Sequence, residues 1–241
     1  MTASDIDQAK QDARERVWAL LERERAAPTG VYGHIPNFVG AEQAADRLAE
    51  LEAWRSARVI KSNPDKAQLP VRVRALHEGK LLYMAVPRLA TPKPFYLLDP
   101  AGLRVPFETA ATSTGAANIA RTIGVDEMCP VDLIVAGSVV VNRQGVRIGK
   151  GAGYSDIEVA LLTEARLIRP ETVIVTTLHR LQVVDEELPE TEHDFSVDLI
   201  VTPDEVIQCG PPRRPSGIVL EHLSAKKVAE IPVLAVFSSR R

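Results

Sequence analysis

The sequence predicts an α/β fold built on a mostly parallel central sheet. Three apolar runs rich in β-branched residues, 131–141, 172–178 and 197–201, suit strands that are buried on both faces of a parallel sheet. Segments with the helical spacing of apolar residues lie between strands, an alternation typical of parallel α/β architectures. In such folds ligands bind at the carboxyl ends of the strands.

The first part of the chain predicts two helices and a short strand. Residues 4–26 carry apolar residues at helical spacing, and Ser4 with Asp7 three positions later has the pattern of a capping box. A second helix is expected over 41–56. A short strand at 58–60 follows it.

The next stretch is open to two interpretations. Residues 71–74 alternate like a strand, but Pro70 can also open a short helix that ends at Gly79. We favour the helix, because it continues the alternation of helices and strands into a strand at 81–86. The proline-rich segment 87–106 is expected to be a long surface connection.

The remaining elements complete one domain with an extension. We expect an interrupted helix in 108–123, an acidic loop at 183–194 and a last strand of the main sheet at 197–201. The chain is divided into an α/β domain, 1–210, and a C-terminal extension, 211–241, packed on the same domain.

Composition excludes several classes of protein. The chain has 241 residues, 45% of them hydrophobic, and a net charge of −3, which argues against a protein that coats nucleic acid or carries membrane spans. Cys129 and Cys209 are far apart and have no histidine pairing nearby, so we expect reduced thiols and no structural zinc. No secretory signal pattern is present, and the protein is expected to be cytoplasmic.

A glycine-rich loop follows the first long apolar run and precedes a helix. Gly149, Gly151 and Gly153 alternate with other residues, and Arg147 and Lys150 stand among them. Backbone N–H groups in such a loop, together with a helix N-terminus, favour phosphate. Asp156, just past the loop, could hold a metal ion that bridges phosphates.

This loop matches neither of two standard phosphate patterns. A Walker A loop has four residues between its first glycine and the Gly-Lys pair. Here only three residues lie between Gly145 and the pair Gly149-Lys150. The dinucleotide fingerprint needs G-x-x-G at its end, whereas this loop reads G-x-G-x-G. A plain connection between strand and helix is the alternative, and we favour a phosphate loop of neither type.

The segment 147–156, R-I-G-K-G-A-G-Y-S-D, resembles the signature R-L-G-R-G-x-G-Y-Y-D of the 5-formyltetrahydrofolate cyclo-ligases, also called methenyltetrahydrofolate synthetases. An early K-x-x-x-R of that family is matched by Lys10 and Arg14, which lie on one helix face and would otherwise be interpreted as solvated charges. A late acidic loop is matched by 192–194. The H-x-I-P-N-F loop at 34–38 is similar to that of a divergent branch, the methenyltetrahydrofolate synthetase domain-containing proteins.

The resemblance implies a three-layer α/β/α fold like that of the NagB/RpiA/CoA-transferase group, and a reaction that uses MgATP to convert 5-formyltetrahydrofolate to 5,10-methenyltetrahydrofolate. It implies ATP contacts from Lys10, Arg14 and the loop, listed by position as Arg147, Ile148, Gly149, Lys150, Gly151, Ala152, Gly153 and Tyr154. Lys150 and Tyr154 are the implied catalytic residues. Asp156 and Asp194 are the implied Mg²⁺ ligands, and Asp65 is the implied contact to the substrate.

Three departures from the family pattern keep other functions open. The segment that reads roughly E-x-x-T in typical members is Asp65-Lys66-Ala67-Gln68 here. Lysine replaces arginine at Lys150, and the second aromatic residue of the signature is Ser155. A paralogue that binds ATP or a phosphorylated metabolite without cyclo-ligase activity is therefore the alternative, and thiamine metabolism is one role suggested for the divergent branch. A third class, an RNA-binding protein, would use the arginines 213, 214, 240 and 241, but the acidic net charge argues against it.

Overall fold

The computed structural model of the chain describes residues 2–235 and contains a large, mostly parallel sheet, as expected. Its strand order is β11-β10-β8-β5-β1-β2-β3-β4. Strands β10, β8, β5, β1 and β2 are parallel, and antiparallel strands close both edges. The strands are β1 (Val59–Ser62), β2 (Leu81–Ala85), β3 (Phe95–Leu98), β4 (Arg121–Ile123), β5 (Val131–Ala136), β8 (Ile168–Thr177), β10 (Leu199–Val201) and β11 (Val206–Gln208).

The strand order reverses direction between β1 and β5. From β1 the chain adds β2 on one side, whereas the later strands β5, β8 and β10 build outward on the other side. At such a switch point the two neighbouring connections leave in opposite directions and open a crevice at the carboxyl ends of the strands. The order of the strands therefore predicts the position of a ligand site.

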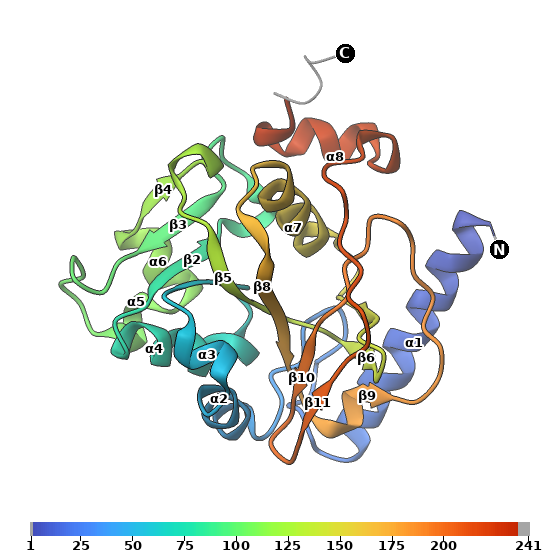
Figure 1. Ribbon diagram of the computed structural model, residues 1–241. Helices are drawn as coiled ribbons and strands as arrows, with labels where there is room; N and C mark the ends of the chain where they lie inside the picture. The colour runs from blue at the N-terminus through green and yellow to red at the C-terminus, as the bar shows by residue number, and fades with distance from the viewer. Residues whose placement is uncertain (1, 236–241) are drawn as a thin grey trace.

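Helices cover both faces of this sheet (Figure 1). On one face α7 (Tyr154–Glu164) packs Ile157 and Leu161 into a core with Ile134 and Ile174. The other face is covered by α2 (Ala41–Ala49), α3 (Glu52–Ser56), α4 (Leu69–His77), α5 (Phe107–Ala110) and α6 (Ser113–Ile119). The three-layer α/β/α architecture is thus confirmed.

A second, smaller sheet carries the N-terminal helix beside the main sheet. It contains β6 (Val140–Asn142), β7 (Arg147–Ile148) and β9 (Val183–Val184), in the order β7-β6-β9. Helix α1 (Ala3–Arg23) packs Val17 and Leu21 into a core shared with Val140 and Ile148. In Figure 1, α1 stands next to β6 and β9.

Two predicted elements are each divided in the structure. The run 131–141 is not one strand: β5 ends at Ala136, and the chain crosses at Gly137 and Ser138 into β6 of the small sheet. Both pieces are buried, so the hydrophobic run continues across the break. The predicted helix 41–56 is likewise two helices, because Leu51 adopts an extended conformation (φ −81°, ψ 146°).

Other predictions need smaller corrections. The proline-rich segment 87–106 is not a simple surface connection, since it contains β3, and the segment 108–123 contains α5, α6 and β4. The helix favoured at 70–79 is confirmed as α4. The first helix is capped by Thr2 with Asp5, not by Ser4 with Asp7, because the same capping-box spacing occurs two residues earlier.

The segment after β11 returns to the main core. Its helix α8 (Ala225–Glu230) precedes Ile231 and Leu234, which are fully buried in the core that also contains α7. Single turns of 3₁₀ helix occur at Lys66–Gln68, Pro87–Leu89, Val125–Glu127, Arg180–Gln182, Leu220–His222 and Pro232–Leu234. Within residues 2–235, no helix has the length and apolar character that a bilayer crossing requires.

A buried ion pair joins the central strand to α7. Lys61 on β1 has no exposed side-chain surface and pairs with Glu158, whose side chain is 4% exposed. Asn63 accepts a hydrogen bond from Lys61 and donates one to Glu158, at 3.3 and 3.5 Å. Burial raises the pKa of the Glu158 carboxyl, and the charge and hydrogen bond of Lys61 oppose that shift. The carboxylate therefore depends on Lys61 for its charge in the core.

Lys61→Met is expected to lower the free energy of unfolding by about 3–5 kcal/mol, because it leaves a buried carboxylate without its partner. The loss should be smaller near pH about 5 than near pH about 8, since an unpaired buried carboxyl takes up a proton more readily. Urea denaturation at both pH values measures this. The double variant Lys61→Met/Glu158→Gln should recover most of the loss.

A matched control is the exposed pair of Arg16 and Glu186, whose side chains are 58% and 51% exposed. Glu186→Gln should change stability by at most about 1 kcal/mol. If Glu186→Gln and Lys61→Met lowered the free energy of unfolding equally, this would contradict the role given to the buried pair.

Candidate functional site

A cavity of about 700 Å³ opens at the carboxyl ends of β1, β2 and β5, where the strand order predicts a ligand site. Its walls come from distant parts of the sequence. They include Asn63–Asp65 after β1, Val86–Arg88 after β2, Gly137 after β5, the glycine loop 149–153, and parts of α1, α7, the 193–194 loop and the segment 217–227. The volume suits a ligand of the size of a nucleotide or a folate.

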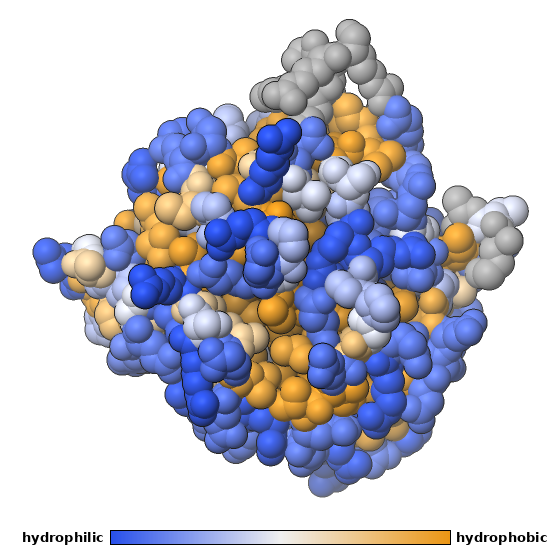
Figure 2. Space-filling view, viewed as in Figure 1, coloured by the Kyte–Doolittle hydropathy of each residue, from blue (hydrophilic) through white to orange (hydrophobic). Residues whose placement is uncertain are grey.

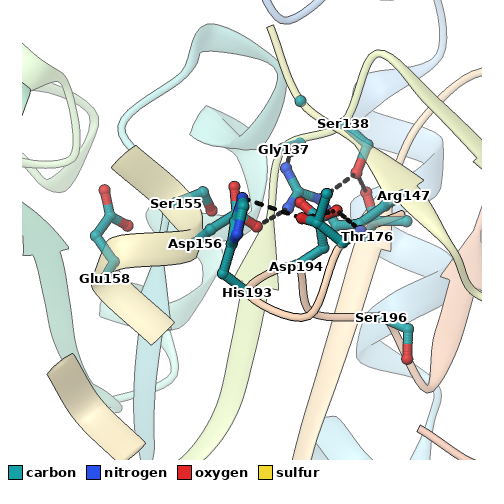
Figure 3. A network of polar contacts seen from close by, with 12 residues as sticks. Gly137, Ser138, Arg147, Ser155, Asp156, Glu158, Thr176, His193, Asp194 and Ser196 are labelled. Carbon is teal, nitrogen blue, oxygen red and sulfur yellow. Dashed lines mark hydrogen bonds and ion pairs between the residues drawn. The ribbon is translucent and has the colours of Figure 1, made fainter. Parts of the chain in front are cut away.

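Arg147 lies beneath the glycine loop and joins the two sheets to α7. Its guanidinium donates to Asp156 Oδ1 at 3.1 Å, to Ser138 Oγ at 3.3 Å and to the Gly137 carbonyl at 3.4 Å. It also lies 4.4 Å from the centre of the Phe195 ring. Figure 3 shows it between the end of β5 and α7. The side chain is only 2% exposed, so its donors are directed into the protein.

Close packing explains Gly149, and backbone conformation explains Gly151. A Cβ atom at Gly149 would lie 2.7 Å from Arg147 Nη2, which is too close for a side chain. Gly151 has φ +96°, a conformation that other residues rarely adopt, and Arg14 lies directly against it. Arg14 Nε donates to the Gly149 carbonyl at 2.7 Å. The loop is therefore shaped by two arginines, Arg147 below and Arg14 from α1.

Lys10 and Asp194 form a buried pair at the cavity wall, with 2.5 Å between Nζ and Oδ2. Asp194 also accepts hydrogen bonds from the backbone and side chain of Thr191, at 2.6 and 2.9 Å. Burial raises the pKa of the Asp194 carboxyl, but Lys10 and Thr191 outweigh this effect and hold the pKa below its usual value. Asp194 is therefore an anion at neutral pH. Lys10 and Arg14 lie in the buried face of α1, and not on a solvated face beside it.

Lys150 and Asp65 face each other across the cavity. Lys150 Nζ lies 3.1 Å from Asp65 Oδ1, and the side chains are 40% and 15% exposed. The sequence suggested phosphate chemistry for Lys150 and substrate contact for Asp65, and the fold brings the two together. Because Lys150 is half-exposed, its ammonium can exchange this carboxylate for a ligand.

Asp156, at the start of α7, has a raised pKa. Burial is the main cause, and the negative charge of Asp194 adds to it, while the charges of Arg147 and Lys10 act in the opposite direction. Asp156 and Asp194 thus lie close enough to interact electrostatically, as Figure 3 shows. Each carboxylate uses one oxygen in an ion pair and has a second oxygen with no hydrogen bond to another described residue. Two carboxylates beside the glycine loop offer oxygen ligands of the kind that Mg²⁺ prefers.

The other predicted loop residues lie around the same cavity. Ile148 is 2% exposed and anchors the loop in the small core, while Ala152 and Tyr154 line the cavity wall. Tyr154 begins α7. His34 also lines the cavity, and its carbonyl accepts a hydrogen bond from Trp18 Nε1 at 3.0 Å.

The arginines considered for RNA binding have protein partners where the structure describes them. Arg213 pairs with Glu190 at 3.3 Å, and Arg214 pairs with Asp198. Arg240 and Arg241 lie outside the described residues. On the face shown in Figure 2, hydrophilic residues cover most of the outline and hydrophobic residues show mainly in the middle.

Sequence reasoning did not predict several cavity residues. Arg88 lines the cavity at the end of β2 with an uncommon positive φ of 59°. His193 and His222 contact each other with 3.2 Å between their Nδ1 atoms. Lys227 reaches the loop from α8. A lysine inside the apolar strand 59–62 could have indicated that Lys61 has a buried acidic partner. The sequence around the other four residues contains no pattern that predicts their position at the cavity.

Comparison with known proteins identifies the family. A sequence model of the 5-formyltetrahydrofolate cyclo-ligase family matches residues 6–203. The chain is 41% identical over 233 residues to a mouse methenyltetrahydrofolate synthase domain-containing protein, covering 94% of this chain and 62% of the relative. It is 39% identical over 238 residues to the human protein of the same name, covering 96% and 62%. The chain thus spans about three fifths of the length of these relatives.

The fold agrees with this result. The solved structure of the 5,10-methenyltetrahydrofolate synthetase of Aquifex aeolicus matches with a TM-score of 0.53 at 23% identity, covering 90% of this chain and 97% of that one. Since the identity is low, this match supports the architecture alone. The sequence model covers most of the chain, including the glycine loop and the carboxylates around it. The chain belongs to the 5-formyltetrahydrofolate cyclo-ligase family.

Proposed function

We propose that the cavity binds MgATP and a reduced folate and converts 5-formyltetrahydrofolate to 5,10-methenyltetrahydrofolate. In this reaction the γ-phosphoryl group of ATP moves to the formyl oxygen. The bridge nitrogen then attacks the activated carbon, and loss of phosphate closes the ring, leaving ADP and phosphate. Family membership supports this class of reaction, and the relatives carry the synthase name as a domain.

One observation carries the proposal. The glycine loop 149–153, the cations Lys10 and Arg14 of α1, and Asp65 after β1 surround one cavity, although they are distant in sequence. Phosphoryl transfer requires mainly positioning and neutralisation of charge, and this arrangement offers both. Asp65 lines the cavity beside Lys150, where its carboxylate could accept hydrogen bonds from a pterin ring.

Each polar residue has a role that follows from its contacts. The Arg147 guanidinium already donates hydrogen bonds to Gly137, Ser138 and Asp156, so its proposed role is to position the loop. Arg14 holds the Gly149 carbonyl and can extend its remaining donors to phosphate oxygens. Lys150 is placed to neutralise the charge of the transferring phosphoryl group. Tyr154 shapes the wall beside it.

Asp156 and Asp194 would hold Mg²⁺ through their second oxygens, directly or through water. When bound, the ion would neutralise charge on the β- and γ-phosphates. Lys10 helps to hold the pKa of the Asp194 carboxyl below its usual value, so Asp194 is available as an anion. Burial raises the pKa of Asp156, and Arg147 and a bound Mg²⁺ would both favour its ionised form.

The reaction can be followed directly. Purified protein with ATP, Mg²⁺ and 5-formyltetrahydrofolate is expected to produce a compound with the near-ultraviolet absorption of a methenyl folate. Chelating Mg²⁺ with EDTA should stop the reaction. An authenticated cyclo-ligase assayed in parallel serves as the positive control, and absence of product at high enzyme concentration in that setting would rule the proposed reaction out.

Lys150→Ala is expected to lower kcat by about 10²–10³-fold, because it removes the charge aimed at the transition state. Its melting temperature should stay close to that of the unchanged protein, since the side chain is 40% exposed. The matched control is Lys66→Ala, an exposed lysine next to Asp65 that does not line the cavity. Similar kcat values for the two variants would refute the role of Lys150.

A second candidate function is supported by the contact between Lys150 and Asp65. The carboxylate that would receive a pterin is already paired with a lysine that replaces the family's usual arginine. A protein that binds ATP or another phosphorylated metabolite, without cyclo-ligase activity, would also explain this arrangement.

Thermal stability separates the two candidates, because a ligand that binds the folded state raises the melting temperature. The first candidate predicts that MgATP and 5-formyltetrahydrofolate each raise it, and the second predicts an increase with MgATP alone. Asp65→Asn should remove the folate-dependent increase and keep the MgATP-dependent one. A folate-dependent increase in the unchanged protein would eliminate the second candidate.

A further inference from the structure

We propose that Lys227 on α8 is an additional phosphate-binding residue of the nucleotide site, which it joins from outside the part of the chain matched by the family model. The matched part ends at residue 203, whereas α8 spans Ala225–Glu230. This proposal rests on the proposed binding of MgATP and names a further residue that would serve it.

Lys227 contacts the glycine loop at its junction with α7. Its ammonium donates a hydrogen bond to the Ala152 carbonyl and lies 4.4 Å from the centre of the Tyr154 ring. A Cβ atom at Gly153 would lie 3.5 Å from Lys227 Nζ. Arg14 holds the Gly149 carbonyl at the other end of the loop. A cation therefore contacts the loop near each of its ends. Arg14 of α1 binds the Gly149 carbonyl, and Lys227 of α8 binds the Ala152 carbonyl.

Some of the lysines and arginines around the cavity form ion pairs with carboxylates, and others do not. Its lining includes six lysines and arginines, of which Lys10, Arg147 and Lys150 form ion pairs with carboxylates. Arg14, Arg88 and Lys227 form no ion pair with a described residue. Two of these three, Arg14 and Lys227, contact the loop. An anion at the loop would therefore meet two cations that form no ion pair with a carboxylate of residues 2–235.

Lys227 also has donors left for such an anion. An ammonium group has three N–H donors, and the Ala152 carbonyl is the acceptor found for it within residues 2–235. Burial lowers the pKa of Lys227, and the charges of Asp156 and Glu230 oppose that shift. A partly buried cation without a counter-ion is costly, so a phosphate oxygen would stabilise it.

The position of α8 does not depend on Lys227 alone. Ile231 and Leu234, directly after the helix, are fully buried in the core that contains α7. Ser224 caps the helix by accepting a hydrogen bond from the Lys227 backbone at 3.2 Å. Removing the ammonium should therefore leave α8 in place and change only the charge at the loop.

The test compares Lys227→Met with Lys226→Met in calorimetric titrations of the full chain with MgATP. Lys226 is the matched control, because its side chain is 83% exposed and lies 3.9 Å from Glu230 on the same helix. Lys227→Met is expected to bind MgATP about tenfold more weakly or worse, whereas Lys226→Met should bind within about twofold of the unchanged protein. Lys227→Arg should recover most of the affinity, since it restores the charge. Melting temperatures of the free variants check that each is folded.

The outcomes separate this proposal from the proposed function. If the unchanged protein binds MgATP and Lys227→Met binds it equally well, the role of Lys227 is overturned while the nucleotide site stands. Tighter binding by Lys227→Met would overturn it as well, because the lysine would then obstruct the loop. If the unchanged protein does not bind MgATP, the proposed function itself fails. Loss of affinity in Lys227→Met, with recovery in Lys227→Arg, supports the proposal.

Discussion

The buried guanidinium of Arg147 is the interaction on which the site depends. It binds the carbonyl of Gly137 at the end of β5, the hydroxyl of Ser138 at the crossing into the small sheet, and the carboxylate of Asp156 on α7. Three segments that arrive from different directions are thereby fixed around one planar group. Arginine suits this position because its five donors point in fixed directions and its charge does not titrate. The glycine loop is shaped above it, where Gly149 leaves room for the guanidinium.

The charges of the site are arranged in pairs around a region that retains positive charge. Lys10 with Asp194, Arg147 with Asp156, and Lys61 with Glu158 neutralise one another within or beneath the cavity wall. In each pair the cation opposes the rise in the carboxyl pKa that burial causes, and at Asp194 the pKa falls below its usual value. The loop itself is contacted by Arg14 and Lys227, which form no ion pair with a carboxylate of residues 2–235. This distribution of charge would attract an anionic ligand more strongly than a neutral one.

The contact between Lys150 and Asp65 connects the two halves of the cavity. One residue comes from the glycine loop and the other from the turn after β1, and they lie at the switch point of the sheet. A half-exposed pair of this kind costs little to separate, because solvent and a ligand can replace each partner. Because the contact joins two walls of the cavity, a substitution at either position would leave the other side chain without this partner.

Local sequence was enough to predict the fold class and to favour a helix that starts near Pro70, because buried parallel strands and helix starts have short-range patterns. Resemblance to a family then indicated that Lys10, Arg14 and Asp194 belong to one site. No sequence pattern links Asp194 to the two residues of the first helix. Tertiary structure alone decided the rest. The division of 131–141 between two sheets depends on which neighbours receive each half, and both halves are equally apolar. Lys227 contacts Ala152, which lies 75 positions away in the sequence. The burial of Ile231 and Leu234 fixes the position of α8 and hence this contact, which the sequence around Lys227 does not predict.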